Sequence, residues 1–75
     1  MAGIRNKVRD LRATHDMTQQ QLADRIELTR QTVIAIEGDK YSPSLETAFR
    51  IANVFAVPLE QVFQYEDHRK GNGKR

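Results

Sequence analysis

The sequence predicts an all-α domain of five short helices. Apolar residues recur at helical spacing through most of the chain, and a serine or threonine stands directly before three of the apolar stretches. Glycine and proline stand where a helix has to end or begin. With 75 residues the chain holds one domain at most. We expect this domain to span residues 1–65, followed by a disordered polar tail over residues 66–75.

The first predicted helix begins near Ile4, because Ile4, Val8 and Leu11 lie at positions i, i+4 and i+7 along one helical face. The second helix follows Thr18. Thr18 and Gln21 have the spacing of a capping box, in which a hydroxyl and an amide satisfy each other's backbone groups. The apolar face of this helix consists of Leu22, Ala23 and Ile26.

The third predicted helix runs from Arg30 to Glu37, with Thr29 as its N-cap and Val33 and Ile36 facing the core. We expect Gly38 to end it in the left-handed conformation, which costs glycine nothing sterically. The last two helices follow Ser44 and Pro58. Their inward residues are Leu45, Ala48, Ile51, Ala52 and Phe55 in the fourth helix, and Leu59, Val62 and Phe63 in the fifth.

Composition excludes several classes of protein. There is no cysteine, so disulfides and thiolate metal sites are ruled out. No apolar run approaches the roughly 20 residues that span a membrane, and the N-terminus lacks the apolar core of a signal peptide. Twelve Lys and Arg against ten Asp and Glu give a net charge of +2, which is weak evidence for nucleic acid. We expect a cytoplasmic protein.

No constellation of residues suggests an enzyme, a cofactor, a metal site or a small-molecule ligand. His15 and His68 lie far apart in the sequence, and the carboxylates are scattered. The segment Glu66-Asp67-His68 is the nearest approach to a metal site. A single histidine in a polar tail is more often simply solvated, so we expect no metal there.

The informative segment joins the second and third helices. The turn Glu27-Leu28-Thr29 is so short that the two helices must cross steeply, as in a helix-turn-helix motif. Arginine and glutamine at the start of the third helix are the residue types that read guanine and adenine edges in the major groove. An ordinary helical bundle is the competing interpretation. The solvent side of the third helix consists of Arg30, Gln31, Thr32, Ile34 and Ala35.

Motifs spread over four helices resemble one family. They are Thr18-Gln19-Gln20-Gln21-Leu22-Ala23, Thr29 to Glu37, Ser42-Pro43-Ser44-Leu45, Ile51 to Phe55 and Pro58 to Phe63. Together they resemble the lambda Cro/CI-type (XRE-type) helix-turn-helix regulators. Within that family the chain is most similar to small stand-alone repressors like the cytolysin repressor, with which it shares Arg30-Gln31-Thr32, Lys40-Tyr41 and Phe63-Gln64.

The resemblance implies a lambda-repressor-like fold whose third helix enters the major groove of double-stranded DNA. The implied base-reading residues are Arg30, Gln31 and Ala35, and Ile34 beside them suits contact with thymine methyl groups. The expected phosphate or positioning contacts are Thr18, Gln19, Thr29, Thr32, Lys40 and Arg12. The resemblance further implies an Arg12–Glu37 salt bridge between the first and third helices.

Two positions depart from the family pattern. The turn after the second helix has Glu27 where glycine is usual, and left-handed geometry costs a non-glycine residue about 1–2 kcal/mol. The loop before Lys40 has Gly38 followed by Asp39, whereas glycine usually stands directly before the lysine. Asp39 also adds negative charge near the expected path of the DNA.

The expected function is a transcriptional repressor that binds a palindromic operator as a homodimer. The expected dimer interface surrounds the fifth helix, where apolar residues exceed what a small domain can bury. It consists of Val57, Leu59, Val62, Phe63 and Tyr65. The resemblance also allows a short strand after Phe63 that pairs with the N-terminus. The alternative is an antitoxin-type protein that mainly binds a toxin, since that class shares the fold.

Overall fold

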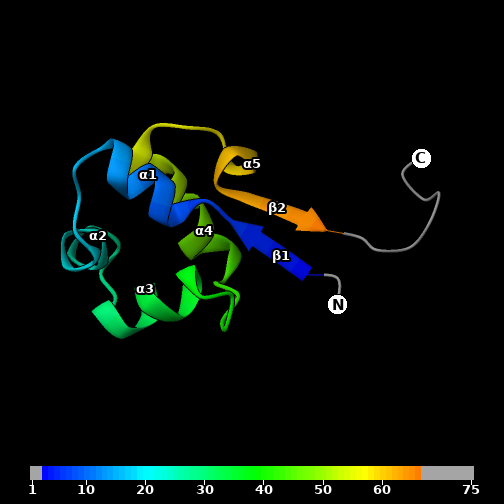
Figure 1. Ribbon diagram of the computed structural model, residues 1–75, viewed down its shortest axis with the longest axis horizontal. Coiled ribbons are helices and arrows are strands. Elements are labelled where there is room, and N and C mark those ends of the chain that lie inside the picture. Colours follow the sequence, from blue (N-terminus) through cyan, green and yellow to red (C-terminus); the bar gives the residue numbers. More distant parts are fainter. Residues whose placement is uncertain (1–2, 67–75) are drawn as a thin grey trace.

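The structure is a computed structural model that describes residues 3–66 (Figure 1). Within that range it consists of five short helices and one two-stranded antiparallel sheet. In chain order the elements are β1 (Gly3–Asn6), α1 (Val8–Thr14), α2 (Gln19–Ile26), α3 (Arg30–Glu37), α4 (Leu45–Phe55), α5 (Leu59–Val62) and β2 (Phe63–Glu66). The five predicted helices are therefore present. Because the chain also contains a sheet, the prediction of a purely α-helical fold is wrong.

The sheet replaces the predicted first turn of the first helix. Ile4 is extended and pairs with Tyr65, and Asn6 pairs with Phe63. The helix begins only at Val8, whose backbone N–H donates to Asn6 Oδ1 over 3.1 Å. β2 includes Glu66, one residue beyond the predicted end of the domain. The predicted tail from residue 67 onward lies outside the described residues.

The predicted N-caps are present at three helices. The side-chain oxygens of Thr18, Thr29 and Ser44 each accept a hydrogen bond from the third backbone N–H of the helix that follows, and Thr18 forms the complete capping box with Gln21. Such caps satisfy backbone donors that the helix itself leaves unpaired.

The helix ends differ partly from the predictions. Glu27 takes the left-handed conformation, with φ 62°. Gly38 does not, because its φ is −87°, and the left-handed position is taken by Asp39, with φ 59°. The prediction for Gly38 is therefore wrong by one residue, and the turn uses a residue type that tolerates this geometry with local polar contacts.

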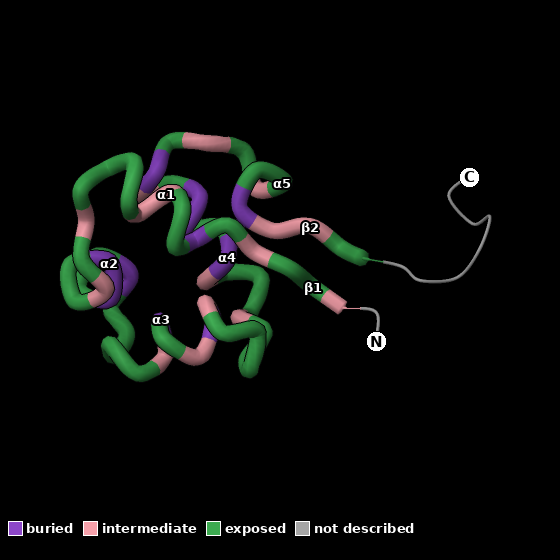
Figure 2. The backbone as a smooth tube through the Cα atoms, in the orientation of Figure 1, coloured by how far each residue is buried: buried purple, intermediate pink, exposed green. Residues whose placement is uncertain are grey.

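The core lies where the five helices meet (Figure 2). The predicted inward faces of α2 and α3 are buried, as are four of the five inward positions predicted in α4. The exception is Leu45, whose exposed fraction is 68%. The largest fully buried side chains are Phe55, Leu22, Ile26, Ile36, Ile51, Val8, Val33 and Val62.

The arrangement presents α3 at one margin of the molecule. Figure 1 shows α2 nearly end-on while α3 runs across the picture, so the two helices cross steeply, as predicted. The β1–β2 ribbon brings the two ends of the described chain side by side, away from α2. Over residues 3–66, no helix has the length and apolar character needed to cross a bilayer.

Candidate nucleic-acid interface

The two faces of α3 differ sharply in burial. Val33 and Ile36 are buried against the core, which fixes the rotation of the helix. On the other side Arg30 and Gln31 are exposed, and Ile34 has an exposed fraction of 45%. Ile34 therefore adds an aliphatic group to the exposed side of α3.

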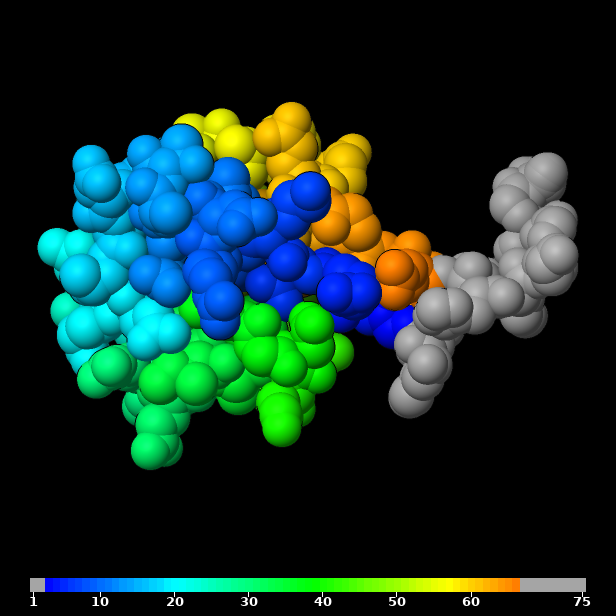
Figure 3. Space-filling model, in the orientation of Figure 1, coloured from blue at the N-terminus to red at the C-terminus, as the bar shows by residue number. Residues whose placement is uncertain are grey.

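Shallow hollows run along the exposed side of α3. One is lined by Gln31, Ile34, Ala35, Gly38 and Lys40. A neighbouring one is lined by Thr29, Gln31, Thr32, Ala35 and Tyr41. In Figure 3, α3 and the loop that follows it form the lower rim of the molecule, coloured green. The structure thus places the predicted base-reading residues Gln31, Ile34 and Ala35 together, beside the predicted phosphate contact Lys40.

Tyr41 belongs to this surface and was not among the predicted site residues. Its side chain is half exposed and shares a hollow with Thr29 and Thr32. The only signal for it in the sequence was its place directly after Lys40. Its ring offers this surface both an apolar face and a hydroxyl donor.

Arg30 faces a different hollow. Together with Thr18, Gln19 and Gln20 it lines the space between the N-terminal ends of α2 and α3. The Nε atom of Arg30 donates to Gln19 Oε1 over 3.5 Å, the outer limit of a hydrogen bond. A cationic side chain therefore stands next to the N-terminal end of α2, a combination that attracts phosphate.

A partly buried polar network ties α1, α2 and α3 together beside this hollow. Arg12 donates from Nε to Glu37 Oε2 over 2.6 Å and from Nη2 to Glu37 Oε1 over 3.1 Å. Its Nη1 atom donates to the carbonyl oxygen of Met17 over 3.0 Å. Gln19 Nε2 adds a 3.2 Å hydrogen bond to Glu37 Oε1. The salt bridge that the family resemblance implied is therefore the centre of a larger network.

The network is shielded from water at one end. The Glu37 side chain is only 2% exposed and that of Arg12 only 15%. The hydrogen bond to Glu37 raises the pKa of Arg12, so the guanidinium stays charged. Each of its three nitrogens already donates within the chain, which leaves two N–H groups for a phosphate. The main role of Arg12 is therefore to hold α3 in position through its hydrogen bonds to Glu37.

The C-terminal end of α3 is held by the ribbon. Asn6 Nδ2 donates to the carbonyl oxygen of Ile36 over 2.8 Å and to Asp39 Oδ1 over 3.1 Å. Arg5 forms a 3.5 Å ion pair with Asp39. The positive charge of Arg5 therefore lies beside the negative charge that Asp39 adds near Lys40.

The structure divides the predicted dimer residues. Val62 is completely buried within its own chain and belongs to its core. Val57, Leu59 and Phe63 are half-buried and pack against the same core. Tyr65 is exposed.

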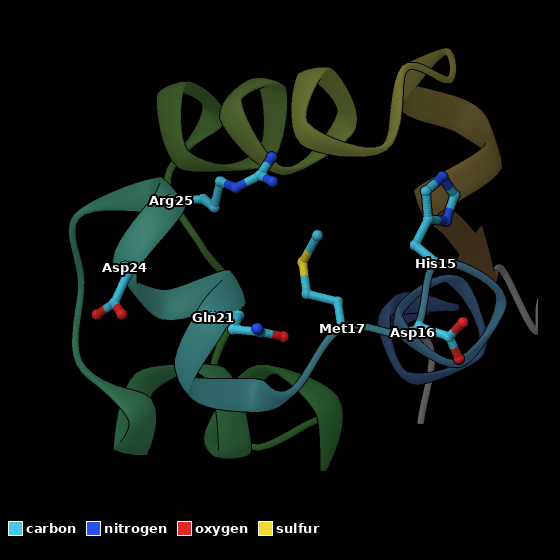
Figure 4. Close-up of a pocket in the computed structure, with 6 residues that line it drawn as sticks. All are labelled: His15, Asp16, Met17, Gln21, Asp24 and Arg25. Atoms are coloured by element: carbon cyan, nitrogen blue, oxygen red, sulfur yellow. The ribbon is translucent and has the colours of Figure 1, made fainter.

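A further hollow lies along one side of α2, between this helix and the segment that follows α1 (Figure 4). It is lined by His15, Asp16, Met17, Gln21, Asp24 and Arg25. In Figure 4 the carboxylates of Asp16 and Asp24 stand at opposite ends of the hollow and point away from each other. Over residues 3–66, no cluster of three or more potential metal-binding side chains is present.

The chain is similar to known helix-turn-helix proteins. The helix-turn-helix family profile matches residues 8–62. An uncharacterized HTH-type transcriptional regulator of Methanocaldococcus jannaschii is 50% identical over 64 residues, which cover 85% of this chain and 97% of the relative. The transcriptional repressor of cryptic phage CTXphi from Vibrio cholerae is 35% identical over 57 residues, which cover 76% of this chain and 51% of the repressor.

Similar solved structures agree on the fold. A crystal structure of a proposed DNA-binding protein from Bacteroides fragilis superposes with a TM-score of 0.75 at 21% identity, covering 81% of this chain and 98% of the other. A hypothetical transcription factor from Neisseria superposes with a TM-score of 0.67 at 26% identity, covering 72% and 62% of the two chains.

Proposed function

Since the chain belongs to the XRE-type helix-turn-helix family of transcriptional regulators, we propose that it is a repressor that occupies a palindromic operator as a homodimer. The observation that carries this proposal is the exposed face of α3. A helix with two fully buried apolar residues on one side has a fixed orientation, and its other side combines amide, small and aliphatic groups within one shallow surface.

The residues at the centre of the proposed contact with base edges are Gln31, Ile34 and Ala35. Gln31 offers the donor and acceptor pair that matches adenine N7 and N6, and Ile34 suits a thymine methyl group. Ala35 is small enough to let the helix approach the floor of the groove. Arg30 stands at the first position of α3 and lines the hollow at the start of α2, and we expect it to contact guanine O6 and N7 from there, beside the other three residues.

The residues proposed to contact phosphate lie on either side of these base-contacting residues. Gln19 begins α2, and its amide is oriented by the hydrogen bond to Glu37. Thr18 and Thr29 accept backbone N–H groups through their hydroxyl oxygens. The hydroxyls of Thr29 and Thr32 share a 3.0 Å hydrogen bond, and Lys40 completes the set at the far end of α3. These contacts fix the register of the protein on DNA without selecting sequence.

The homodimer follows from the small reading surface. One short helix contacts only a few base pairs, and two copies related by a two-fold axis read two half-sites about one helical turn, or roughly 34 Å, apart. Occupying such a site near a promoter is sufficient for repression.

Selection of bound sequences from random duplexes tests the proposal. We expect a palindrome with two half-sites at that spacing.

Lys40→Ala should weaken binding to all duplexes similarly and lower the salt slope by about one for each subunit. Gln61→Ala, at an exposed position of α5, is the control and should change neither the selected sequence nor the salt slope. Enrichment of no common sequence by the wild-type protein would reject the proposal.

A further inference from the structure

Gly38 lies directly after α3, on the side of the domain that we propose faces DNA. Its φ is −87° and its ψ is 9°, a conformation that residues with a side chain adopt in ordinary turns. The left-handed position that follows α3 is taken by Asp39 instead. The backbone therefore gives no reason for a glycine at position 38.

Packing within the domain gives no reason for this glycine either. A Cβ atom placed on Gly38 would lie 3.4 Å from the carbonyl oxygen of Ile34 and 3.7 Å from Cγ of Lys40. Both are ordinary van der Waals distances, so the fold has room for an alanine. Ile34 and Lys40 also line the shallow hollow beside Gly38. The space that the missing side chain leaves therefore belongs to the surface of the domain.

This hollow is mainly apolar, and we call it the Gly38 hollow. It is lined by Gln31, Ile34, Ala35, Gly38 and Lys40. Ile34 and Ala35 supply aliphatic groups, and Cγ of Lys40 lies close to the opposite side of Gly38. A lysine can cover an apolar surface with its stem while its ammonium reaches a phosphate. The hollow thus suits a small uncharged apolar group that belongs to an anionic ligand.

The nearest carboxylate is engaged elsewhere. Oδ1 of Asp39 accepts a 3.1 Å hydrogen bond from Asn6, and its Oδ2 lies 3.5 Å from Nε of Arg5. Both partners belong to β1. Of the described residues that line the Gly38 hollow, Lys40 alone is charged. An anionic ligand therefore meets a cation at this hollow.

We propose that the Gly38 hollow accepts the 5-methyl group of a pyrimidine, the group by which thymine differs from uracil and 5-methylcytosine from cytosine. Among the four DNA bases only thymine presents such a methyl group in the major groove. The proposal rests on the proposed function, because it names the part of the DNA that this end of α3 recognises. Methylation of a cytosine at the same position of the operator then strengthens binding.

The surroundings identify DNA as the source of the methyl group. Gln31, which we propose reads adenine, lines the same hollow, and the partner of adenine in DNA is thymine. Lys40 supplies the charge that a neighbouring phosphate requires. The space that glycine leaves in place of alanine is that of one methyl group.

Replacement of single thymines by uracil provides the test, because it removes only the methyl group. The operator is the sequence that the wild-type chain enriches from random duplexes, and fluorescence anisotropy at fixed salt measures binding. We expect a thymine at which uracil lowers the wild-type affinity roughly fourfold, the effect of leaving one methyl group unburied. At the same position, 5-methylcytosine should bind more tightly than cytosine by about the same factor.

Gly38→Ala tests whether the hollow is the site of this effect. Its added methyl group should fill the hollow, so the variant should bind the thymine and uracil operators equally, with the affinity of wild type for the uracil operator. Its melting temperature should not fall, because alanine fits the backbone and its neighbours. Gly3→Ala is the matched control. A Cβ atom there meets nothing within 4 Å, and the variant should keep the wild-type ratio.

Ile34→Ala provides a second variant, because it removes one wall of the hollow without filling it. The exposed position of Ile34 leaves the core intact, and the preference for thymine over uracil should again be lost. Retention of the full preference by both Ile34→Ala and Gly38→Ala would place the methyl contact elsewhere and overturn the proposal.

The remaining outcomes separate this inference from the proposed function. A wild-type chain that selects an operator but binds every uracil-substituted duplex as tightly as the original has no methyl pocket, and the proposed function stands. Equal weakening of the thymine and uracil operators by Gly38→Ala means that the hollow receives another part of the DNA, which also overturns the inference alone. A wild-type chain that enriches no sequence rejects the proposed function and the methyl pocket together.

Discussion

The two ends of α3 are held in different ways. At the C-terminal end, Glu37 is almost completely buried and bonds to Arg12 and Gln19. At the N-terminal end, Thr29 caps an exposed turn, and the residue that precedes the turn, Glu27, is left-handed and exposed. The buried end sets the position of α3 on the domain, and the exposed end is free to meet a ligand.

This difference indicates where substitutions should act. Changes near Glu37 should lower stability and thereby weaken DNA binding indirectly. Changes near Arg30 and Gln31 should leave stability alone and alter which DNA is bound.

The largest expected effect is on stability at the buried end. Glu37→Ala leaves Arg12 charged and without its main partner, which should cost about 3–5 kcal/mol of unfolding free energy. Because the pKa of Arg12 is raised, its stabilising charge is present at all pH values below that pKa and is lost only as pH rises through it. Urea denaturation at neutral pH measures the effect.

The double variant Arg12→Met/Glu37→Leu is the control for that prediction. Replacing both charges by apolar side chains of similar size removes the burial penalty together with the attraction, so the double variant should be much more stable than Glu37→Ala. Equal losses of unfolding free energy in Glu37→Ala and in the double variant would show that the ion pair does not hold the C-terminal end of α3.

A smaller effect is expected where the ribbon meets α3. Asn6→Ala removes the hydrogen bonds to Val8, Ile36 and Asp39 at one junction. We expect a loss of about 1–3 kcal/mol, since two of these bonds satisfy backbone groups at helix ends. Gln20→Ala removes one exposed hydrogen bond within α2 and is the control, with a change within about 0.5 kcal/mol. Chemical denaturation of both variants provides the comparison.

The smallest effect is expected at the exposed turn. Glu27→Gly should stabilise the domain by about 1 kcal/mol, because glycine has no penalty at φ 62°. The substitution also removes the ion pair between Glu27 and Arg50. This pair joins two exposed side chains over 3.7 Å, so it contributes little to stability. Ala56→Gly, at φ 57°, should shift the melting temperature in the same direction. A lower melting temperature for Glu27→Gly would show that the turn is not strained.

Local patterns in the sequence predicted much of this structure. Threonine and serine caps, helical spacing and the short turn after α2 each depend on neighbouring residues, and they were found correctly. Ile4 was assigned wrongly because its spacing to Val8 also fits a helix, and only pairing with Tyr65, distant in sequence, makes it a strand. Leu45 was assigned to the core because periodicity cannot distinguish an inward face from its flank.

Contacts between segments that are distant in the sequence could not be predicted from such local patterns. The Arg12–Glu37 pair was expected only through the family resemblance, since nothing local to either residue requires it. The three-way contact of Asn6 joins residues up to 33 positions apart and had no signal in the sequence.

The exposed end of α3 is the part of the molecule that we propose reads DNA sequence. Binding of wild type, Arg30→Ala and Gln31→Ala to a panel of single-base operator variants tests this proposal most directly. We predict that each alanine variant loses its preference at one base pair of each half-site, by about 1–3 kcal/mol, and keeps its preferences elsewhere. If both substitutions instead weaken binding to every duplex equally, with no base pair losing its preference, α3 does not read sequence through these residues.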